Sequence, residues 1–594
     1  MRRASDHLRR LYRKLIPPRA ETSAVGMTVL LAGVVGIGAG LLALLLGWLI
    51  TWLNRHLFFG IGHGLDALPG PWNYCLILIP AAVFLLVAWV LRRWAPEAYG
   101  AGISHVMSAV GRGGYIRRRV MFIKPLATAL CIGAGAPLGM EGPVVQAGAA
   151  VGSAVGGRFK MGVENIRILV AAGAAAGLAA KYGAPIGGAV FSAELILGSA
   201  STAALLPLIV ASFLAVLTRH AVMGGTPEYQ IAAEHFHFAG ADYLAFLVLG
   251  VACGLAAVYF IKTIFAAEAT MDRLFSQWWA KALFGGLVVG LVGFLCRDLL
   301  GTGRPVIQTL LTEPEYSLKL LLLFVVLKPL LCSTALASGT SGGIFAPSLF
   351  AGAALGALFV RVLSGGLSLE TAPTAAYVMV GMAAVMGAVM RAPLQAILVT
   401  FELAHNYSLV PPLMIACVVS LKVSELFEPE SAFTRWLVRK GERIRRGMDF
   451  ALLDGIRVRD IMDEQYVALP ADASIGEIAP LVRASENRTF PVVGDDGKLA
   501  GIVMLAGLMA AAVRSAAGAP QPAVRELLEP EPVYLGPDDS LARAWRVMGN
   551  YDYDCLPVCL WTPEGLNILG ICEKEAIVEM HDRQAFVTLS RRSR

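Results

Sequence analysis

Apolar stretches recur along most of this chain, and several are about 20 residues long, which is the length that crosses a bilayer as an α-helix. Short polar or Gly/Pro-containing segments separate them. Clear examples are Val25–Leu53, Tyr74–Leu91, Tyr243–Ile264 and Leu318–Leu336, with a shorter apolar run at Leu205–Leu217. The pattern predicts a polytopic, all-α membrane region, followed by a more polar C-terminal part.

The composition supports this class. Of 594 residues, 56% are hydrophobic and only 16% are charged, which is too apolar for a soluble protein of this size. The 63 glycines suit close helix packing in a membrane.

The basic residues predict the orientation. Residues 1–24 are expected to form a basic cytoplasmic helix, because Met1–Ala20 holds seven Arg or Lys and one Asp. Arg92 and Arg93 mark the return of the chain to that side, and the basic run Arg439–Arg446 is the final exit. Both termini are therefore expected in the cytoplasm of a plasma membrane or bacterial inner membrane. The net charge of +7 is explained by this topology, so no nucleic-acid partner is expected.

One segment, Gly139-Met-Glu141-Gly-Pro143, places a carboxylate between glycines and directly before an apolar Gly/Ala run. Proline suits the first turn of a helix, and glycines let the backbone expose its amides. A helix N-terminus attracts anions through its unpaired N–H groups and its dipole. Glu141 is then either an ordinary acidic cap or a tethered anion at a place where a free anion also binds.

An internal repeat divides the membrane region. Pro143–Gly152 matches Pro347–Gly356, which lies 204 residues later. In a second pair, Glu194 follows Pro185 by nine residues and Glu402 follows Pro393 by nine. These matches predict two related halves, at about 25–220 and 240–428, within a transmembrane domain of 25–437. Short helices broken by Gly and Pro mark the substrate site in transporters with such repeats.

Other polar residues in the apolar region have two interpretations each. Glu194 and Glu402 are functional carboxylates or, as their symmetry favours, structural ones that bind backbone N–H groups of a neighbouring helix. Lys124 either adds positive potential near a pore or anchors a helix end. His235 and His237 form a weak metal pattern, for which a solvated loop is the better interpretation. The nine cysteines show neither metal spacing nor a disulfide framework.

These motifs resemble those of the CLC family of chloride channels and chloride/proton exchangers. Gly139–Pro143 resembles the motif with the external gating glutamate, and Gly343-Ile-Phe-Ala-Pro347 resembles the motif whose amides bind chloride. Gly100–Ser104 resembles the first anion-binding motif more loosely. The resemblance implies an inverted repeat, a homodimer and one pore inside each subunit.

The resemblance also implies roles for single residues. Glu141 is expected to gate the pathway by competing with chloride, and the amides of Ile344, Phe345 and the Gly142 region are expected to bind the anion. No cofactor or metal is implied.

Four positions depart from the family pattern. Ala101 replaces a serine of the first motif, whose proline position is Ser104. Phe433, expected near the end of the last membrane helix, replaces a tyrosine. Leu195 replaces the carboxylate that passes protons in exchangers. Weak central anion binding and channel-like conduction are therefore favoured, with chloride/proton exchange as the alternative.

The polar C-terminal part begins with a linker at 438–455 and ends with a tail at 583–594. Between them, 456–515 and 522–582 repeat a β-α-β-β-α order, which resembles a tandem CBS pair. The hydroxyl and acid expected after each Gly-Ile strand for nucleotide binding are missing: Met504 and Gly507 stand in the first module. Glu573 and Ala576 stand in the second. Nucleotide binding is therefore doubtful, and a structural or dimer-stabilising role is favoured, with Cys555, Cys559 and Cys572 as core residues.

Two alternatives belong to other classes of function. A CBS-bearing divalent-cation channel needs several pore-lining acids, and the apolar region has few. A nucleotide-sensing scaffold without transport is disfavoured by the degenerate modules. No set of residues with catalytic spacing is found, so an enzyme is not expected.

Overall fold

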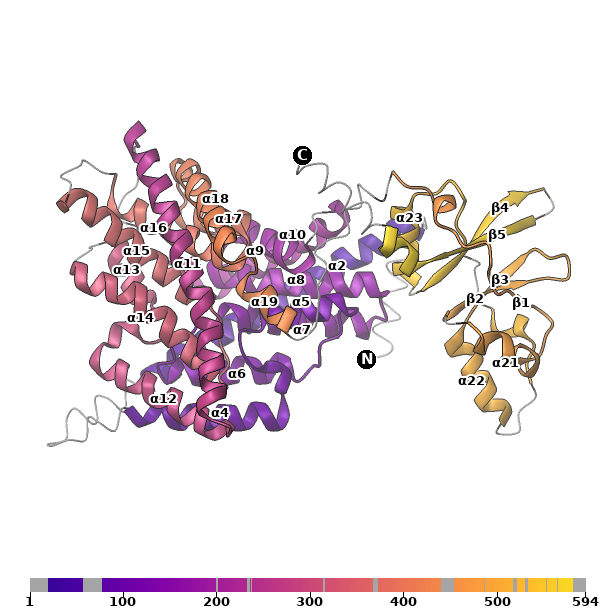
Figure 1. Cartoon of the computed structure of the whole chain (residues 1–594), viewed down its shortest axis with the longest axis horizontal. Helices are drawn as coiled ribbons and strands as arrows, with labels where there is room; N and C mark the ends of the chain where they lie inside the picture. The colour runs from indigo at the N-terminus through magenta and orange to yellow at the C-terminus, as the bar shows by residue number, and fades with distance from the viewer. Residues whose placement is uncertain are drawn as a thin grey trace. The chain divides into compact units, whose positions relative to one another are not determined.

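The computed structural model (Figure 1) divides into two compact units. One comprises Met1–Met161 and Ile166–Arg446, and the other comprises Gly162–Asn165 and Gly447–Arg594. The structure describes residues 20–56, 77–198, 201–231, 236, 238–312, 316–366, 372–439, 453, 455–485, 487–516, 521–528, 533–551, 553–563 and 565–580.

The first half of the membrane unit begins with a long helix and ends with another. In chain order its elements are α2 (Ala20–Leu53), α4 (Leu78–Trp94), the 3-10 turn η3 (Pro96–Ala98), α5 (Ile103–Gly111), α6 (Val120–Gly133), α7 (Glu141–Arg158), α8 (Val163–Tyr182), α9 (Pro185–Phe191), the π-helical η4 (Ser192–Leu197) and α10 (Thr202–Met223).

The second half repeats this order. Its elements are α11 (Gly240–Leu274), α12 (Trp278–Leu295), the 3-10 turn η5 (Arg297–Leu299), α13 (Arg304–Thr312), α14 (Leu318–Ala337), α15 (Phe345–Gly366), α16 (Thr374–Met390), α17 (Pro393–Ala404), the 3-10 turn η6 (Tyr407–Leu409), α18 (Val410–Phe427) and α19 (Ala432–Arg439). The first and last long helices of each half pack together, α2 against α10 and α11 against α18.

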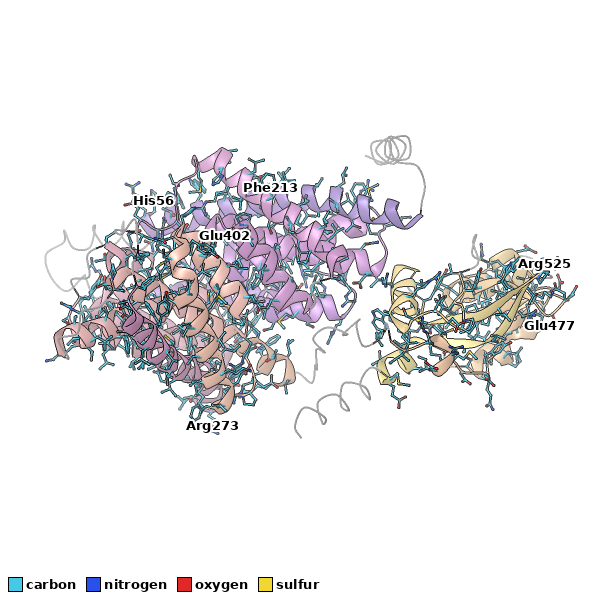
Figure 2. The ribbon with its side chains drawn as sticks, turned by 90° about the horizontal axis from the view of Figure 1, so that it is seen from above. His56, Phe213, Arg273, Glu402, Glu477 and Arg525 are labelled. Atoms are coloured by element: carbon cyan, nitrogen blue, oxygen red, sulfur yellow. The ribbon has the colours of Figure 1, made fainter. Side chains whose placement is uncertain are left out.

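Eight helices in the described part of the chain are long and apolar enough to cross a membrane. They leave large apolar side chains uncovered, as a surface in contact with lipid requires. Phe213 is one example: it lies at the surface of the membrane unit (Figure 2) and is 56% exposed. The expected multi-pass, all-α membrane region is confirmed.

The innermost helices are built from small residues that let backbones touch. A Cβ added at Gly148 of α7 would lie 2.1 Å from the carbonyl oxygen of Gly173 on α8. The second half repeats this contact, since a Cβ at Gly352 of α15 would lie 2.2 Å from the carbonyl oxygen of Gly381 on α16. The repeat seen in the sequence is therefore a repeat of packing.

The two halves contact each other through the segments that precede their central helices and through two pairs of helices. The segments that lead into α7 and α15 pair antiparallel at Gly139 and Gly343, which exchange hydrogen bonds of 2.8 and 2.6 Å. The halves also pack together where α4 meets α12 and where α9 meets α17. Helix starts from both halves therefore face one another in the interior.

The C-terminal unit contains all the named strands of the described structure (Figure 1). Its first module has a sheet in the order β1-β2-β3, with β1 parallel to β2 and β2 antiparallel to β3. The bounds are η7 (Val458–Asp460), β1 (Leu469–Pro470), α21 (Ile475–Arg483), β2 (Thr489–Val493), β3 (Leu499–Met504) and α22 (Leu505–Ala516).

The second module keeps the same order in reduced form. It consists of η8 (Val524–Leu527), α23 (Leu541–Tyr551) and the antiparallel strands β4 (Cys555–Thr562) and β5 (Gly565–Glu573). Its first strand was expected at Val524–Leu528, but this segment is the 3-10 turn η8, and a single parallel bridge joins Leu535 to Val558 instead. The three cysteines are buried, and burial raises the pKa of the Cys559 and Cys572 thiols to about 12.

Several predictions concern residues outside the described structure. They include most of the N-terminal segment 1–24, most of the linker 438–455, all of the tail 583–594, and the pair His235 and His237. Phe433 lies in the short helix α19 (Ala432–Arg439), which follows α18 (Val410–Phe427) within the last candidate membrane span, Tyr407–Arg439.

Candidate functional site

Three helix starts converge in the interior of the membrane unit. The backbone N–H of Gly100, just before α5, donates to Thr340 at 3.1 Å, and the N–H of Gly342, just before α15, donates to Gly100 at 3.4 Å. The Gly139–Gly343 pairing adds the start of α7. Because helix N-termini carry unpaired N–H groups and partial positive charge, this arrangement suits an anion.

Glycine is required where α5 and α7 approach. A Cβ added at Gly142 would lie 2.0 Å from the carbonyl oxygen of Ala101, so no other residue fits without moving a backbone. Gly102 has a φ of +88°, a conformation that glycine adopts without steric cost. Gly139, Pro143, Gly343 and Pro347 hold the corresponding positions around α7 and α15.

Glu141 lies at the start of α15, although it belongs to the first turn of α7. One carboxylate oxygen accepts a hydrogen bond from the backbone N–H of Ala346 at 3.3 Å. The other accepts from the hydroxyl of Tyr182 at 2.8 Å. The side chain is 1% exposed, so a buried carboxylate occupies the position where the amides of α15 would meet a free anion.

Ile344 and Phe345 begin the α15 segment and are buried. The first N–H groups of an α-helix have no acceptor within the helix. In the described part of the chain, the bond from Ala346 to Glu141 accounts for one of these donors. The amides of Ile344 and Phe345 lie directly before it, which is where sequence reasoning placed the anion donors.

A pocket lies on another side of the same helix starts. Ala101, Ser104, Ile344 and Phe433 line it, with Glu268 of α11 in the same wall. The Ser104 hydroxyl donates to the carbonyl oxygen of Phe433 at 3.4 Å. The structure therefore brings together the three residues that differ from, or replace, the expected hydroxyl donors.

Thr434, which follows Phe433 and also carries a hydroxyl, is engaged elsewhere. Its Oγ1 accepts a hydrogen bond from the backbone N–H of Ser431 at 2.9 Å and lies 3.0 Å from the Ser431 hydroxyl. It caps the start of α19 and is not among the residues that line the pocket.

The two symmetric carboxylates cross between the halves. Glu402 of α17 accepts from the backbone N–H groups of Ile186 and Gly187 at 2.9 and 2.7 Å. Glu194 of η4 accepts from Leu394 and Gln395 at 3.3 and 2.9 Å. Figure 2 shows Glu402 within the helical body of the membrane unit. Each carboxylate caps the short helix of the other half, as the structural interpretation expects.

Leu195 lies next to Glu194 in η4 and is 1% exposed. Its apolar side chain replaces the expected internal carboxylate, and Glu194 is already bonded to α17. Leu195 therefore offers no ionisable group at the position where exchangers are expected to pass protons, and the neighbouring Glu194 accepts two hydrogen bonds from α17.

Two functional candidates were missed from the sequence. Tyr182, which contacts Glu141, carries no motif of its own. Lys328 repeats Lys124 at the offset of 204 residues, and each precedes a proline. The Lys124 ammonium donates to the carbonyls of Ala98 and Gly100 at 2.9 and 2.5 Å, and Lys328 donates to Leu299 and Gly301 at 3.0 and 2.8 Å. The repeated Lys-Pro pair was a usable signal.

No group of three or more His, Cys, Asp or Glu side chains within the described ranges is arranged to hold a metal ion.

The fold and the site define a membrane channel or transporter whose interior is lined by helix N-termini. The divalent-cation channel has no support in this geometry, since partial positive charge repels cations.

Residues 83–425 match the family model for the voltage gated chloride channel, and residues 458–514 and 524–580 match the CBS domain. The chain therefore belongs to the CLC family of voltage-gated chloride channels and carries two CBS domains. This is a family of channels and transporters, not of enzymes.

Curated relatives cover much of the chain. It is 33% identical over 378 residues to the putative chloride channel protein ClcB-like of Ralstonia nicotianae, covering 62% of this chain and 86% of that protein. It is 29% identical over 399 residues to the voltage-gated ClC-type chloride channel ClcB of Salmonella typhimurium, covering 66% and 92%.

Two solved structures are also similar to this chain. A slow cyanobacterial Cl−/H+ antiporter is 28% identical, with a TM-score of 0.64 over 70% of this chain and 99% of that one. A eukaryotic CLC transporter, 20% identical with a TM-score of 0.64, covers 92% of this chain and 97% of its own, which shows a shared fold.

Proposed function

We propose that the protein carries chloride across the membrane along a path inside each subunit, and that Glu141 gates this path. The observation that carries the proposal is the bond between the Glu141 carboxylate and the first turn of α15. A tethered carboxylate at a helix N-terminus supports the proposal, because the unpaired N–H groups and the dipole of such a terminus favour a negative charge.

The site suits an anion that binds moderately and is released, as transport requires. A full positive side chain beside a dehydrated anion would hold it too tightly for release, whereas several helix dipoles and backbone amides bind moderately. Ionised Glu141 competes with chloride for these donors. When Glu141 takes up a proton, the charge that holds it there disappears and chloride replaces it.

Conduction without obligatory proton exchange is the favoured mode. Exchange needs a group that brings protons from the cytoplasm to Glu141, and Leu195 has no such group. Glu194 accepts two hydrogen bonds from α17, which ties its carboxylate to a structural task.

Proton-coupled exchange is the second candidate, for two reasons. Glu268 lines the pocket beside Ser104 and Phe433, where a carboxylate could take protons by another route. It also lies 3.2 Å from the guanidinium of Arg439, which fixes its position. The cyanobacterial relative that is 28% identical is a Cl−/H+ antiporter.

Central anion binding is proposed to be weak and to depend on the backbone. Ala101 and Phe433 provide no hydroxyl, and the Ser104 hydroxyl points to the Phe433 carbonyl. The amides of Ile344 and Phe345 then supply most of the attraction, so discrimination between nitrate and chloride is reduced.

The test uses purified protein in liposomes loaded with chloride. Chloride efflux is measured under a potassium-valinomycin voltage clamp while external pH is recorded. Conduction predicts efflux without stoichiometric proton movement. Uphill proton movement in a fixed ratio to chloride would replace conduction by exchange, and the absence of anion flux would refute the function itself.

The remaining assignments are proposals of the same kind. We place both termini on the cytoplasmic side of a plasma or bacterial inner membrane, since basic residues mark that side and Arg92 and Arg93 lie in the last turn of α4. We propose a homodimer with one path in each subunit. The CBS pair is proposed to act structurally, because Glu573 accepts a hydrogen bond from Asn487 within the pair and the ribose-binding acid position is Ala576.

A further inference from the structure

The hydroxyl of Tyr182 is the side-chain hydrogen-bond donor to Glu141 in the described structure. It donates to the carboxylate at 2.8 Å, and Tyr182 is only 5% exposed. Its ring stacks on that of Phe345, with centroids 5.5 Å apart. One side chain therefore contacts both the proposed gate and a residue of the proposed anion site.

The end of α8 holds this tyrosine in a fixed place. Gly183 has a φ of +69° and ends the helix directly after it. The guanidinium of Arg219 donates to the carbonyls of Ala180 and Lys181, which closes the last turn. With its backbone and ring both fixed, the hydroxyl is prepositioned for the carboxylate.

The repeat shows that the scaffold does not require this bond. In the second half, Met390 occupies the position of Tyr182, and Arg391 repeats the left-handed conformation of Gly183 with a φ of +59°. Phe345 occupies the position of Glu141. The same backbone forms in the second half without the acid and without the hydroxyl, so the pair belongs to the gate.

Other charged and titratable groups face this corner of the site. Lys181 pairs with Glu228 at 2.6 Å, and both Arg219 and Arg304 lie 3.4 Å from the same carboxylate. Tyr229 is buried beside them. The cations thus have Glu228 as their direct partner, whereas Tyr182 contacts Glu141 itself.

We propose that Tyr182 is a positioning residue that holds ionised Glu141 in the anion path and so sets the pH range in which the path opens. The inference rests on the proposed gating by Glu141. A hydroxyl that donates to a carboxylate favours its ionised form. The bond therefore favours the closed state, and its loss makes opening easier.

The experiment measures chloride efflux from liposomes between about pH 3 and about 8, a range that brackets ordinary carboxyl titration. In Tyr182→Phe the ring and its stacking remain. The midpoint of the flux–pH curve is expected to move to higher pH by about one to two units, the equivalent of one hydrogen bond to a charged group.

Two controls separate this role from a general effect. Tyr229→Phe removes a buried hydroxyl from the same corner that, within the described residues, makes no hydrogen bond to Glu141, and its midpoint should not move. In a Glu141→Gln background, Tyr182→Phe should leave flux unchanged, because no ionised gate remains.

The outcomes are distinguishable. If Glu141→Gln is insensitive to pH and Tyr182→Phe keeps the wild-type midpoint, the role of Tyr182 is refuted while the gate stands. If Glu141→Gln keeps wild-type pH dependence, the gate is refuted, and the role of Tyr182 with it.

Discussion

The two halves of the membrane unit share nearly every structural device. Each has a buried lysine before a proline, a Gly-to-Gly contact between its two central helices and a carboxylate that caps a short helix of the other half. These repeated parts build the scaffold, and they bring the helix starts together.

The halves differ at the proposed site of function. The first carries Glu141 and Tyr182, which are hydrogen-bonded to each other, and the second carries Phe345 and Met390 at the same positions. The comparison indicates that the symmetric residues make the fold, and that the asymmetric pair of Glu141 and Tyr182 carries the proposed gate.

The largest effect is expected from breaking the shared scaffold. Glu402→Ala and Glu194→Ala each remove two hydrogen bonds to a carboxylate, at a cost of about 3 kcal/mol in stability. Both should lower the thermal unfolding midpoint of the detergent-solubilised protein. Glu425→Ala is the control, because its ion pair with Lys422 is largely exposed and contributes little. Equal midpoints in all three variants would contradict the structural role.

The next effect comes from removing the asymmetry itself. Glu141→Ala leaves the α15 amides to the anion, so flux near neutral pH should rise about tenfold and lose most of its pH dependence. Glu141→Gln should behave like the protonated wild type at every pH. Chloride flux from liposomes at several pH values measures both, and wild-type profiles in the two variants would refute the gate.

A matched pair of lysine variants tests whether symmetric residues have equal tasks. Lys124 donates to Gly100, which lines the pocket, whereas Lys328 donates around η5 and lies 4.6 Å from the ring centre of Phe350. Lys124→Met should weaken chloride binding about tenfold through lost positive potential. Lys328→Met should change it less than about twofold. Calorimetric titration with chloride separates the two variants. Wild-type affinity in both would show that neither lysine acts on the anion.

The smallest effect is expected at the remaining hydroxyl of the pocket. Ser104→Ala should alter chloride affinity by less than about threefold, because the hydroxyl donates to the Phe433 carbonyl and a lost neutral bond costs little. Calorimetry is again the measurement. Tight wild-type binding that Ser104→Ala abolishes would mean that the side chain, and not the α15 backbone, holds the anion.

Local patterns in the sequence were enough for the fold class, because apolar spans, the repeat and the Gly/Pro helix starts each have a direct physical meaning. The same patterns gave the capping role of Glu194 and Glu402, since symmetry makes a shared task the simpler explanation. Bounds were less exact, because the polar segment after Phe427 divides the last candidate membrane span, Tyr407–Arg439, into α18 and α19.

Tyr182 could not be found in this way. Its proposed role depends on a hydrogen bond to Glu141, which lies 41 residues earlier in the chain. The local sequence Ala-Lys181-Tyr182-Gly183 contains no pattern that predicts this contact. The first strand of the second CBS module was misplaced at Val524–Leu528 for a similar reason, because the single bridge at Leu535 depends on the position of β4. Contacts that are distant along the chain and lack a repeat stay hidden until the structure is known.

The crossed caps of Glu194 and Glu402 also constrain how the protein is made. A ribosome that has synthesised only the first half has produced the amides of Ile186 and Gly187 but not the carboxylate that satisfies them. Unpaired backbone groups are costly in a bilayer. The first half therefore cannot complete its packing before the segment around Glu402 has been synthesised. Until then α9 is incompletely packed or is shielded by the insertion machinery. Biogenesis of this membrane unit is thus a joint event for both halves, so a chain truncated before α17 should be recognised as unfinished and degraded.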